Sequence, residues 1–134
     1  MKTAFVLGIL TLLILAAPSV FGQTKPTLDQ QKACADQAQT FEARKPKDID
    51  IWEITNHFDN TTQTCYVMTY AVKGMGKDGV YRAYKIFDAF EGRVYGDFSQ
   101  LHTVLTSSIH GQHPSSDTEF LELADRYFGI KAAD

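Results

Sequence analysis

Long hydrophobic runs and basic clusters are both missing from this sequence. The longest apolar run covers residues 4–17, which is short of the roughly 20 residues that a membrane-spanning helix needs. The 13 basic residues are scattered and are outnumbered by 16 acidic ones, which argues against nucleic acids and anionic membrane surfaces as partners. No internal repeat or low-complexity tract is present, so one ordinary domain is expected.

Sequence signatures of common enzyme classes are absent as well. There is no G-x-S-x-G motif and no signature of a cysteine nucleophile. No motif implies a cofactor, so none is expected. These absences favour a protein that is not an enzyme.

The N-terminus has the layout of a secretory signal peptide. Lys2 precedes the apolar run and small residues follow it as far as Gly22, which is the order of a positive region, an apolar core and a cleavage site. We place cleavage after Gly22, with a cut after Ser19 as the alternative. The mature protein would be a single domain, residues 23–134, with 12 basic and 16 acidic residues and a net charge of −4. It would be secreted or periplasmic and would keep no membrane anchor after cleavage.

Two cysteines, Cys34 and Cys65, remain in the mature chain. In an oxidising compartment an isolated pair is more often a disulfide than a metal site or a catalytic thiol. We therefore predict a Cys34–Cys65 disulfide, with two unpaired buried thiols as the alternative.

Two helices and four strands are predicted from capping signals and hydrophobic periodicity. Thr27 with Gln30 fits a capping box at a helix start. Ser116 with Glu119 fits a second one, and Gly129 suits the end of that helix. Residues 99–113 fit a helical turn, a fifth strand or an ordered loop, and the chain after Gly129 is expected to fray. The predicted helices cover residues 27–44 and 116–129, and the predicted strands cover residues 51–58, 64–72, 80–90 and 93–98.

These elements predict an α+β fold with an N-terminal helix, a four-stranded antiparallel meander and a C-terminal helix. The arrangement would be cystatin-like, as an analogy of architecture. Between the last two strands, a two-residue turn at 91–92 would pair Ala89 with Val94. Asp88 and Asp97 would then be neighbours on one polar face, where surface ion pairing is favoured over catalysis.

Histidines supply weak candidates for catalysis and metal binding. His57 lies close to an aspartate in the chain and could act as a general base, although a histidine at a strand end is more often a structural hydrogen-bonding group. His102, His110 and His113 could supply metal nitrogens, but zinc needs three or four converging ligands. No catalytic residue and no metal site is therefore assigned.

The strongest candidate for a binding surface is aromatic. Tyr66 and Tyr70 alternate on one side of the second predicted strand, and Tyr84 and Tyr95, with Arg93 nearby, could extend that face. An aromatic sheet face can serve as a recognition platform, because tyrosine offers apolar area together with a hydroxyl. The alternative, somewhat favoured because large exposed apolar patches are unusual, is that the C-terminal helix covers this face.

Three short segments form a pattern: the helix that carries Cys34, the NHFDNTTQTC segment (56–65) and the DAFEGRVYGDF hairpin (88–98). The pattern resembles a family of small exported bacterial proteins of unassigned function. In that family a helix with one cysteine precedes an S-H-Y-N-like strand end, a cysteine-aromatic strand and a D-A-aromatic-E-G-R/K hairpin. Here Asn, Phe and Asp at positions 56, 58 and 59 replace the Ser, Tyr and Asn of that pattern. The resemblance covers roughly residues 32–98 and implies an exported, disulfide-linked domain, with no activity attached.

The sequence thus predicts an exported, non-enzymatic domain that binds an unknown protein or small ligand. The alternative is a small hydrolase that uses His57 with a nearby carboxylate. An open aromatic face, with His57 away from any cleft, would favour the binding domain. A pocket that joins His57 to Asp88, Asp97 or a hydroxyl group would favour the hydrolase.

Overall fold

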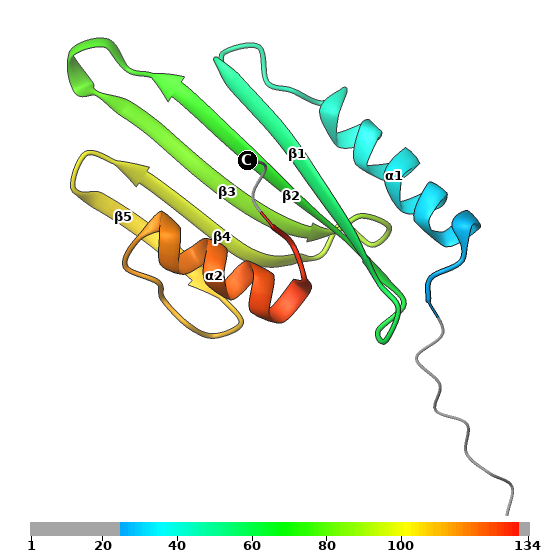
Figure 1. Ribbon diagram of the computed structural model, residues 1–134. Coiled ribbons are helices and arrows are strands. Elements are labelled where there is room, and N and C mark those ends of the chain that lie inside the picture. The colour runs from blue at the N-terminus through cyan, green and yellow to red at the C-terminus, as the bar shows by residue number, and fades with distance from the viewer. Residues whose placement is uncertain (1–24, 132–134) are drawn as a thin grey trace, which may run out of the picture.

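A computed structural model describes residues 25–131, which form one antiparallel sheet with two helices packed against it (Figure 1). Each strand pairs with the next strand along the chain, in the order β1-β2-β3-β4-β5. The predicted signal peptide and its cleavage site lie outside the described residues. The elements are α1 (Leu28–Glu42), β1 (Ile51–Asp59), β2 (Thr64–Gly74), η1 (Gly76–Asp78), β3 (Val80–Asp88), β4 (Val94–Leu101), β5 (Val104–Ile109) and α2 (Asp117–Phe128).

The predicted order of helix, meander and helix is confirmed, but the sheet has five strands and the prediction of four is wrong. The fifth strand, β5, comes from the segment for which the sequence left three possibilities. Leu101 pairs with Val104, so the chain reverses in a two-residue turn in which His102 takes a positive φ of 54°. Ile109 at the end of β5 is fully buried, and its burial against the core explains why this polar segment forms a strand. None of the helices in residues 25–131 has the length and hydropathy of a membrane span.

Both helices begin where the capping signals predict. The Thr27 hydroxyl accepts a hydrogen bond from the Gln30 N–H, and the Gln30 side chain accepts one from the Thr27 N–H, which completes the capping box. At α2, the Ser116 hydroxyl accepts from the Glu119 N–H in the same way. The Glu119 carboxylate instead accepts two hydrogen bonds from Ser115, so this second box is only half formed.

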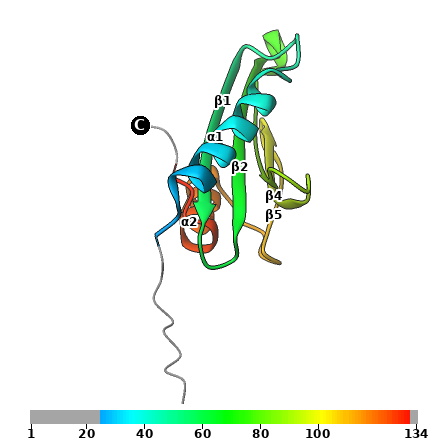
Figure 2. The same ribbon diagram turned by 90° about the vertical axis from the view of Figure 1, so that its right-hand side faces the viewer.

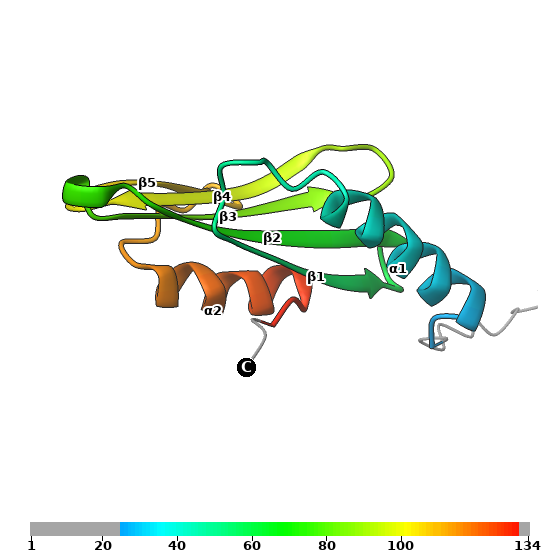
Figure 3. The same cartoon turned by 90° about the horizontal axis from the view of Figure 1, so that it is seen from above.

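The larger core lies between α2 and one face of the sheet, which Figure 3 shows from above. Phe120 of α2 is fully buried and its ring lies 5.8 Å from that of Tyr84 and 5.7 Å from that of Phe98. Gly129 ends the helix in a left-handed conformation with φ 64°. Ile130 is only 1% exposed, so the prediction that the chain frays directly after Gly129 is wrong at this residue, which packs into the core.

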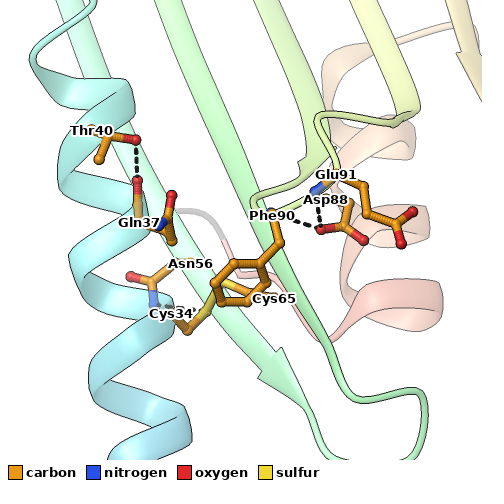
Figure 4. Close-up of a disulfide and its surroundings, with 8 residues drawn as sticks. All are labelled: Cys34, Gln37, Thr40, Asn56, Cys65, Asp88, Phe90 and Glu91. Atoms are coloured by element: carbon orange, nitrogen blue, oxygen red, sulfur yellow. Dashed lines mark hydrogen bonds between the residues drawn. A yellow bond between two sulfur atoms is a disulfide. The ribbon is translucent and has the colours of Figure 1, made fainter.

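A smaller core lies on the opposite face, where α1 packs on β1 and β2 (Figure 2). The predicted disulfide is confirmed: Cys34 of α1 and Cys65 of β2 are bonded at 2.07 Å, and both are fully buried (Figure 4). Of the α1 side chains, Cys34 and Ala38 are buried and Phe41 is partly buried. Because so few side chains of α1 reach the core, the disulfide makes a large contribution to holding α1 on the sheet.

The turn between β3 and β4 differs from the prediction. Phe87 pairs with Val94, and the register shifts between Ile86 and Phe87, so the two-residue turn at 91–92 is wrong. The reason is a side-chain hydrogen bond that favours a longer loop. The buried Asp88 carboxylate accepts from the backbone N–H groups of Phe90 and Glu91, at 2.8 and 3.1 Å (Figure 4).

The shifted register also separates the two aspartates that were predicted to be neighbours. Asp97 pairs with Lys85, whereas Asp88 pairs with Tyr66. Paired residues in an antiparallel sheet share a face, and successive residues of a strand point to opposite faces. Asp88 therefore lies on the face that α2 covers, and Asp97 lies on the other face.

Replacing Gly92 with valine is expected to destabilise the domain by more than about 1 kcal/mol. Gly92 takes φ 70°, a conformation that strains a β-branched residue, and no neighbouring atom lies within 4 Å of the position that a Cβ would occupy. The substitution therefore tests backbone strain without a steric clash, and urea unfolding measures the resulting loss of stability. Gly92→Asn is the matched control, because asparagine tolerates positive φ and should cost less. Equal stability of wild type and the valine variant would contradict this conformation.

Candidate functional site

The two faces of the sheet are covered unequally. α2 packs beneath β4 and β5, while α1, the linker to β1 and the β3–β4 loop lie on the opposite side (Figure 3). α1 covers only the β1 and β2 side of that second face. Between these segments lies a groove of about 460 Å³, which we call the sheet groove.

Small side chains form the floor of the sheet groove. Ala71 of β2 pairs with Ala83 of β3, and Ala83 pairs with Ser99 of β4, so three short side chains stand side by side across the central strands. Adjacent strands are about 4.8 Å apart, which makes this row roughly 10 Å long. The floor is depressed because these side chains are shorter than those around them.

Aromatic side chains form the walls. Trp52 of β1 stands at one end of the row of small residues, where it pairs with Ala71. Tyr81 and Phe87 of β3 line the groove on either side of that row. The Phe41 ring of α1 packs against Phe87 with 5.3 Å between ring centroids, so the helix itself supports one wall.

The indole of Trp52 has an unsatisfied hydrogen-bond donor. Its Nε1 is shielded from solvent and has no acceptor within the described residues. An unpaired buried donor costs about 1–3 kcal/mol, and most buried polar groups in native structures have a hydrogen-bond partner. The wall of the sheet groove therefore contains a polar group that the domain itself does not satisfy.

Two charged side chains from neighbouring strands also line the groove. Lys85 and Asp97 are directly opposite each other across β3 and β4. No ion pair joins them. Among residues 25–131 the ion pairs are Lys32–Asp36 and Lys73–Asp48. The Lys85 ammonium lies over the Phe87 ring instead, 5.9 Å from its centroid.

The predicted tyrosine face is the one that α2 covers. Tyr66 and Tyr84 are 5% and 9% exposed and belong to the larger core, and Tyr70 and Tyr95 pack against its edge. Tyr70 stacks on Tyr84 with 4.6 Å between centroids, and the Arg93 guanidinium lies 5.3 Å from the centroid of the Tyr95 ring. The structure thus shows the second of the two alternatives that the sequence left, in which the C-terminal helix packs over the tyrosines.

Packing beneath α2 changes the acidity of one tyrosine. Burial, together with the neighbouring Tyr70 and Asp117, raises the pKa of Tyr84 from its ordinary value of 10.0 to about 12. The folded state then holds the phenol proton more tightly than the unfolded state does. Its contribution to stability is therefore complete below pH 10 and is lost as the pH rises from 10 through 12.

An ultraviolet absorbance titration tests this shift, because tyrosinate absorbs where tyrosine does not. Wild type should show a phase near pH 12 that is missing from Tyr84→Phe. Between pH 10 and 12 the wild type should also lose more stability than this variant, which has no phenol at position 84. Superimposable titration curves would show that Tyr84 is not the late-titrating group.

His57 lies apart from the sheet groove. It is exposed, its ring packs against Gly129, and it lines a second cavity of about 280 Å³ near the disulfide. The other side chains lining that cavity include neither a carboxylate nor a hydroxyl group; they are Pro26, Gln31, Cys34, Asn56 and Phe58. The hydrolase alternative therefore stays a prediction with no geometric observation in its favour.

The nearby Asp59 carboxylate, the closest acid in sequence to His57, is engaged in the β1–β2 turn. Burial raises its pKa, but hydrogen bonds from Thr61 and Thr62 outweigh this effect and hold the pKa below its usual value. A carboxylate that is kept ionised in this way stabilises the turn and is a poor proton donor.

The three histidines considered as weak candidates for metal binding are held in separate contacts. His110 stacks on Tyr127 at 4.3 Å, and His113 Nδ1 lies 2.7 Å from the Ser107 carbonyl oxygen. His102 packs against Gly79 at the far end of the sheet. Within residues 25–131 no three His, Cys, Asp or Glu side chains come together as a metal site would require.

Sequence reasoning missed the residues of the sheet groove. The alternation in β2 places Tyr66 and Met68 on one face and Thr69 and Ala71 on the other. The predicted binding surface was based on the large side chains, although large apolar residues are the ones that a helix covers. The small residues recur as Ala83 in the next strand, and that repetition was the signal for a shallow region of the sheet.

No family model, curated protein or solved structure matches this chain. The resemblance to small exported bacterial proteins accordingly stays an expectation from short motifs. A function for the domain has to be argued from the sheet groove.

Proposed function

We propose that this protein is an exported, non-enzymatic binding domain that takes its ligand in the sheet groove. The observation that carries the proposal is that α2 covers one sheet face while the opposite face keeps an apolar groove of about 460 Å³. Small-molecule sites generally measure about 300–1,000 Å³ and are mostly apolar with a few polar groups.

Three further features support the proposal. The aromatic walls of the sheet groove, which include Trp52 and Tyr81, are the side chains that dominate binding sites. The Cys34–Cys65 disulfide is consistent with an oxidising, extracytoplasmic compartment. Export itself rests on the predicted signal peptide, and the cystatin-like and bacterial-family resemblances remain analogies that agree with it.

Replacing Ala83 with glutamate tests whether the groove is the binding site. The side chain would stand on the groove floor and could point its carboxylate to solvent, so the fold should survive while the floor is filled. Wild type should retain a partner or small ligand from the extracellular or periplasmic fraction, and Ala83→Glu should lose most of it. Affinity capture with mass spectrometry of both proteins and metabolites measures this.

The matched control is Thr118→Glu, which adds the same charge to the exposed first turn of α2 on the other side of the sheet. Circular dichroism and thermal unfolding confirm that both variants are folded. Thr118→Glu should keep the captured molecule. If Ala83→Glu keeps it as well, binding occurs elsewhere and the proposal fails.

A further inference from the structure

Four cations lie in or beside the sheet groove of an acidic domain. Three belong to the α1–β1 linker, whose Pro46 and Ile49 line the groove, and the fourth stands in the groove wall. Neither Arg44 nor Lys85 has an ion-pair partner among the described residues. Each lies over a phenylalanine ring, at 5.4 and 5.9 Å from its centroid. The four cations are Arg44, Lys45, Lys47 and Lys85.

Most carboxylates of this region are already engaged. Asp48 pairs with Lys73, and the Asp50 carboxylate accepts a hydrogen bond from the Gly74 N–H at 2.6 Å. Asp97 lines the groove and, like Asp50, has no ion-pair partner in residues 25–131. Residues 44–50 and the groove lining together carry four basic and three acidic side chains, and one of those acids, Asp48, is paired with Lys73. This slight excess of positive charge beside an apolar floor favours an anionic group on the ligand.

The dimensions of the floor indicate a small ligand. Tyr81 and Lys85 are four residues apart on β3, which corresponds to about 13 Å along the strand. The row of small residues from Ala71 to Ser99 spans roughly 10 Å across the sheet. A surface of this size accommodates one ring system and its polar substituent.

We propose that the sheet groove binds small amphipathic carboxylates, with an apolar ring on Ala71 and Ala83 beside Trp52 and the carboxylate held by Lys85. This inference rests on the proposed binding function and narrows it to one ligand chemistry. Lys85 supplies the charge, the alanine floor supplies apolar contact, and Trp52 shields one end from water. Asp97 opposes the carboxylate and weakens its binding.

Three probes with the same ring separate the apolar contribution from the charge: phenylacetate, phenylethanol and phenethylamine. The chain has one tryptophan, so the indole N–H of Trp52 gives a single amide-region resonance that reports on the groove. Titration followed by ¹H–¹⁵N NMR should shift this resonance with all three probes. The Kd should be lowest for phenylacetate and highest for phenethylamine. We expect the Kd of phenylacetate to be about three- to fivefold below that of phenylethanol, because a partly exposed charge pair contributes a free energy of that size.

Two variants of the groove should change this order in opposite directions. Lys85→Gln should raise the Kd of phenylacetate about three- to fivefold and leave the Kd of phenylethanol unchanged. Asp97→Asn should strengthen phenylacetate and weaken phenethylamine, which damage to the fold would not do. Lys131→Gln, which removes a lysine beyond α2, is the control and should leave all three affinities unchanged.

The outcomes distinguish a failure of this inference from a failure of the proposed function. Equal affinities for the three probes, or no effect of Lys85→Gln and Asp97→Asn, would overturn the preference for carboxylates while groove binding stands. An unmoved Trp52 resonance with every probe would overturn the small-ligand inference. The proposed function would fail only if Ala83→Glu also left capture from the native fraction intact.

Discussion

Replacing both Cys34 and Cys65 with alanine is expected to lower the free energy of unfolding by roughly 3–4 kcal/mol. The disulfide joins residues 31 positions apart, and closing a loop of that length removes conformational entropy from the unfolded chain. Urea unfolding of the oxidised wild type and of the double variant measures the difference. A loss of this size is a large fraction of the stability of an ordinary domain.

The effect should be concentrated in α1. This helix buries few side chains, so without the disulfide it should detach from β1 and β2 before the sheet unfolds. Hydrogen exchange should become faster in residues 28–42 and change little in α2. Lys32→Ala, which removes only the exposed pair with Asp36, is the control and should cost less than about 1 kcal/mol. Uniform loss of protection along the chain would show that α1 and the sheet unfold as one unit.

Replacing Phe120 with alanine is expected to cost about 3–5 kcal/mol. Phe120 is fully buried, and its ring packs against those of both Tyr84 and Phe98. Removing it leaves a cavity beneath α2 that the surrounding aromatic rings cannot fill without leaving their preferred positions. The free energy of unfolding, from urea denaturation at neutral pH, measures this cost.

Phe90→Ala is the matched control, since the same side chain is removed from a position that is 54% exposed. It should cost less than about 1 kcal/mol, because most of that ring already contacts water. If the two variants lost equal stability, Phe120 would not be the anchor of α2.

Local sequence signals were sufficient for the elements themselves. The capping residues Thr27 and Ser116 mark the helix starts that the structure shows, because a cap depends on atoms within one turn. The disulfide could also be predicted, since the sequence contains only two cysteines. Four of the five strands have side-chain alternation that a single strand displays by itself.

Features that depend on contacts between distant segments could not be predicted from local sequence signals. The register between β3 and β4 depends on the hydrogen bonds that the buried Asp88 carboxylate accepts from its own loop, and hydrophobic alternation alone favoured a different turn. β5 has a polar sequence and becomes a strand because β4 provides a partner and the core buries Ile109.

The sequence by itself determined that this chain is an α+β domain with capped helices, an antiparallel meander and a Cys34–Cys65 disulfide. Only the tertiary structure decided which sheet face α2 covers and where a groove is left on the other. The periodicity of β2 separates a face with Tyr66 from a face with Ala71, but it cannot say where α2 docks. Burial of apolar area settles that choice: α2 gains more by covering the large tyrosines than by covering small side chains. On the other face α1 covers only the β1 and β2 side, and the shallow region around Ala71 and Ala83 holds the sheet groove.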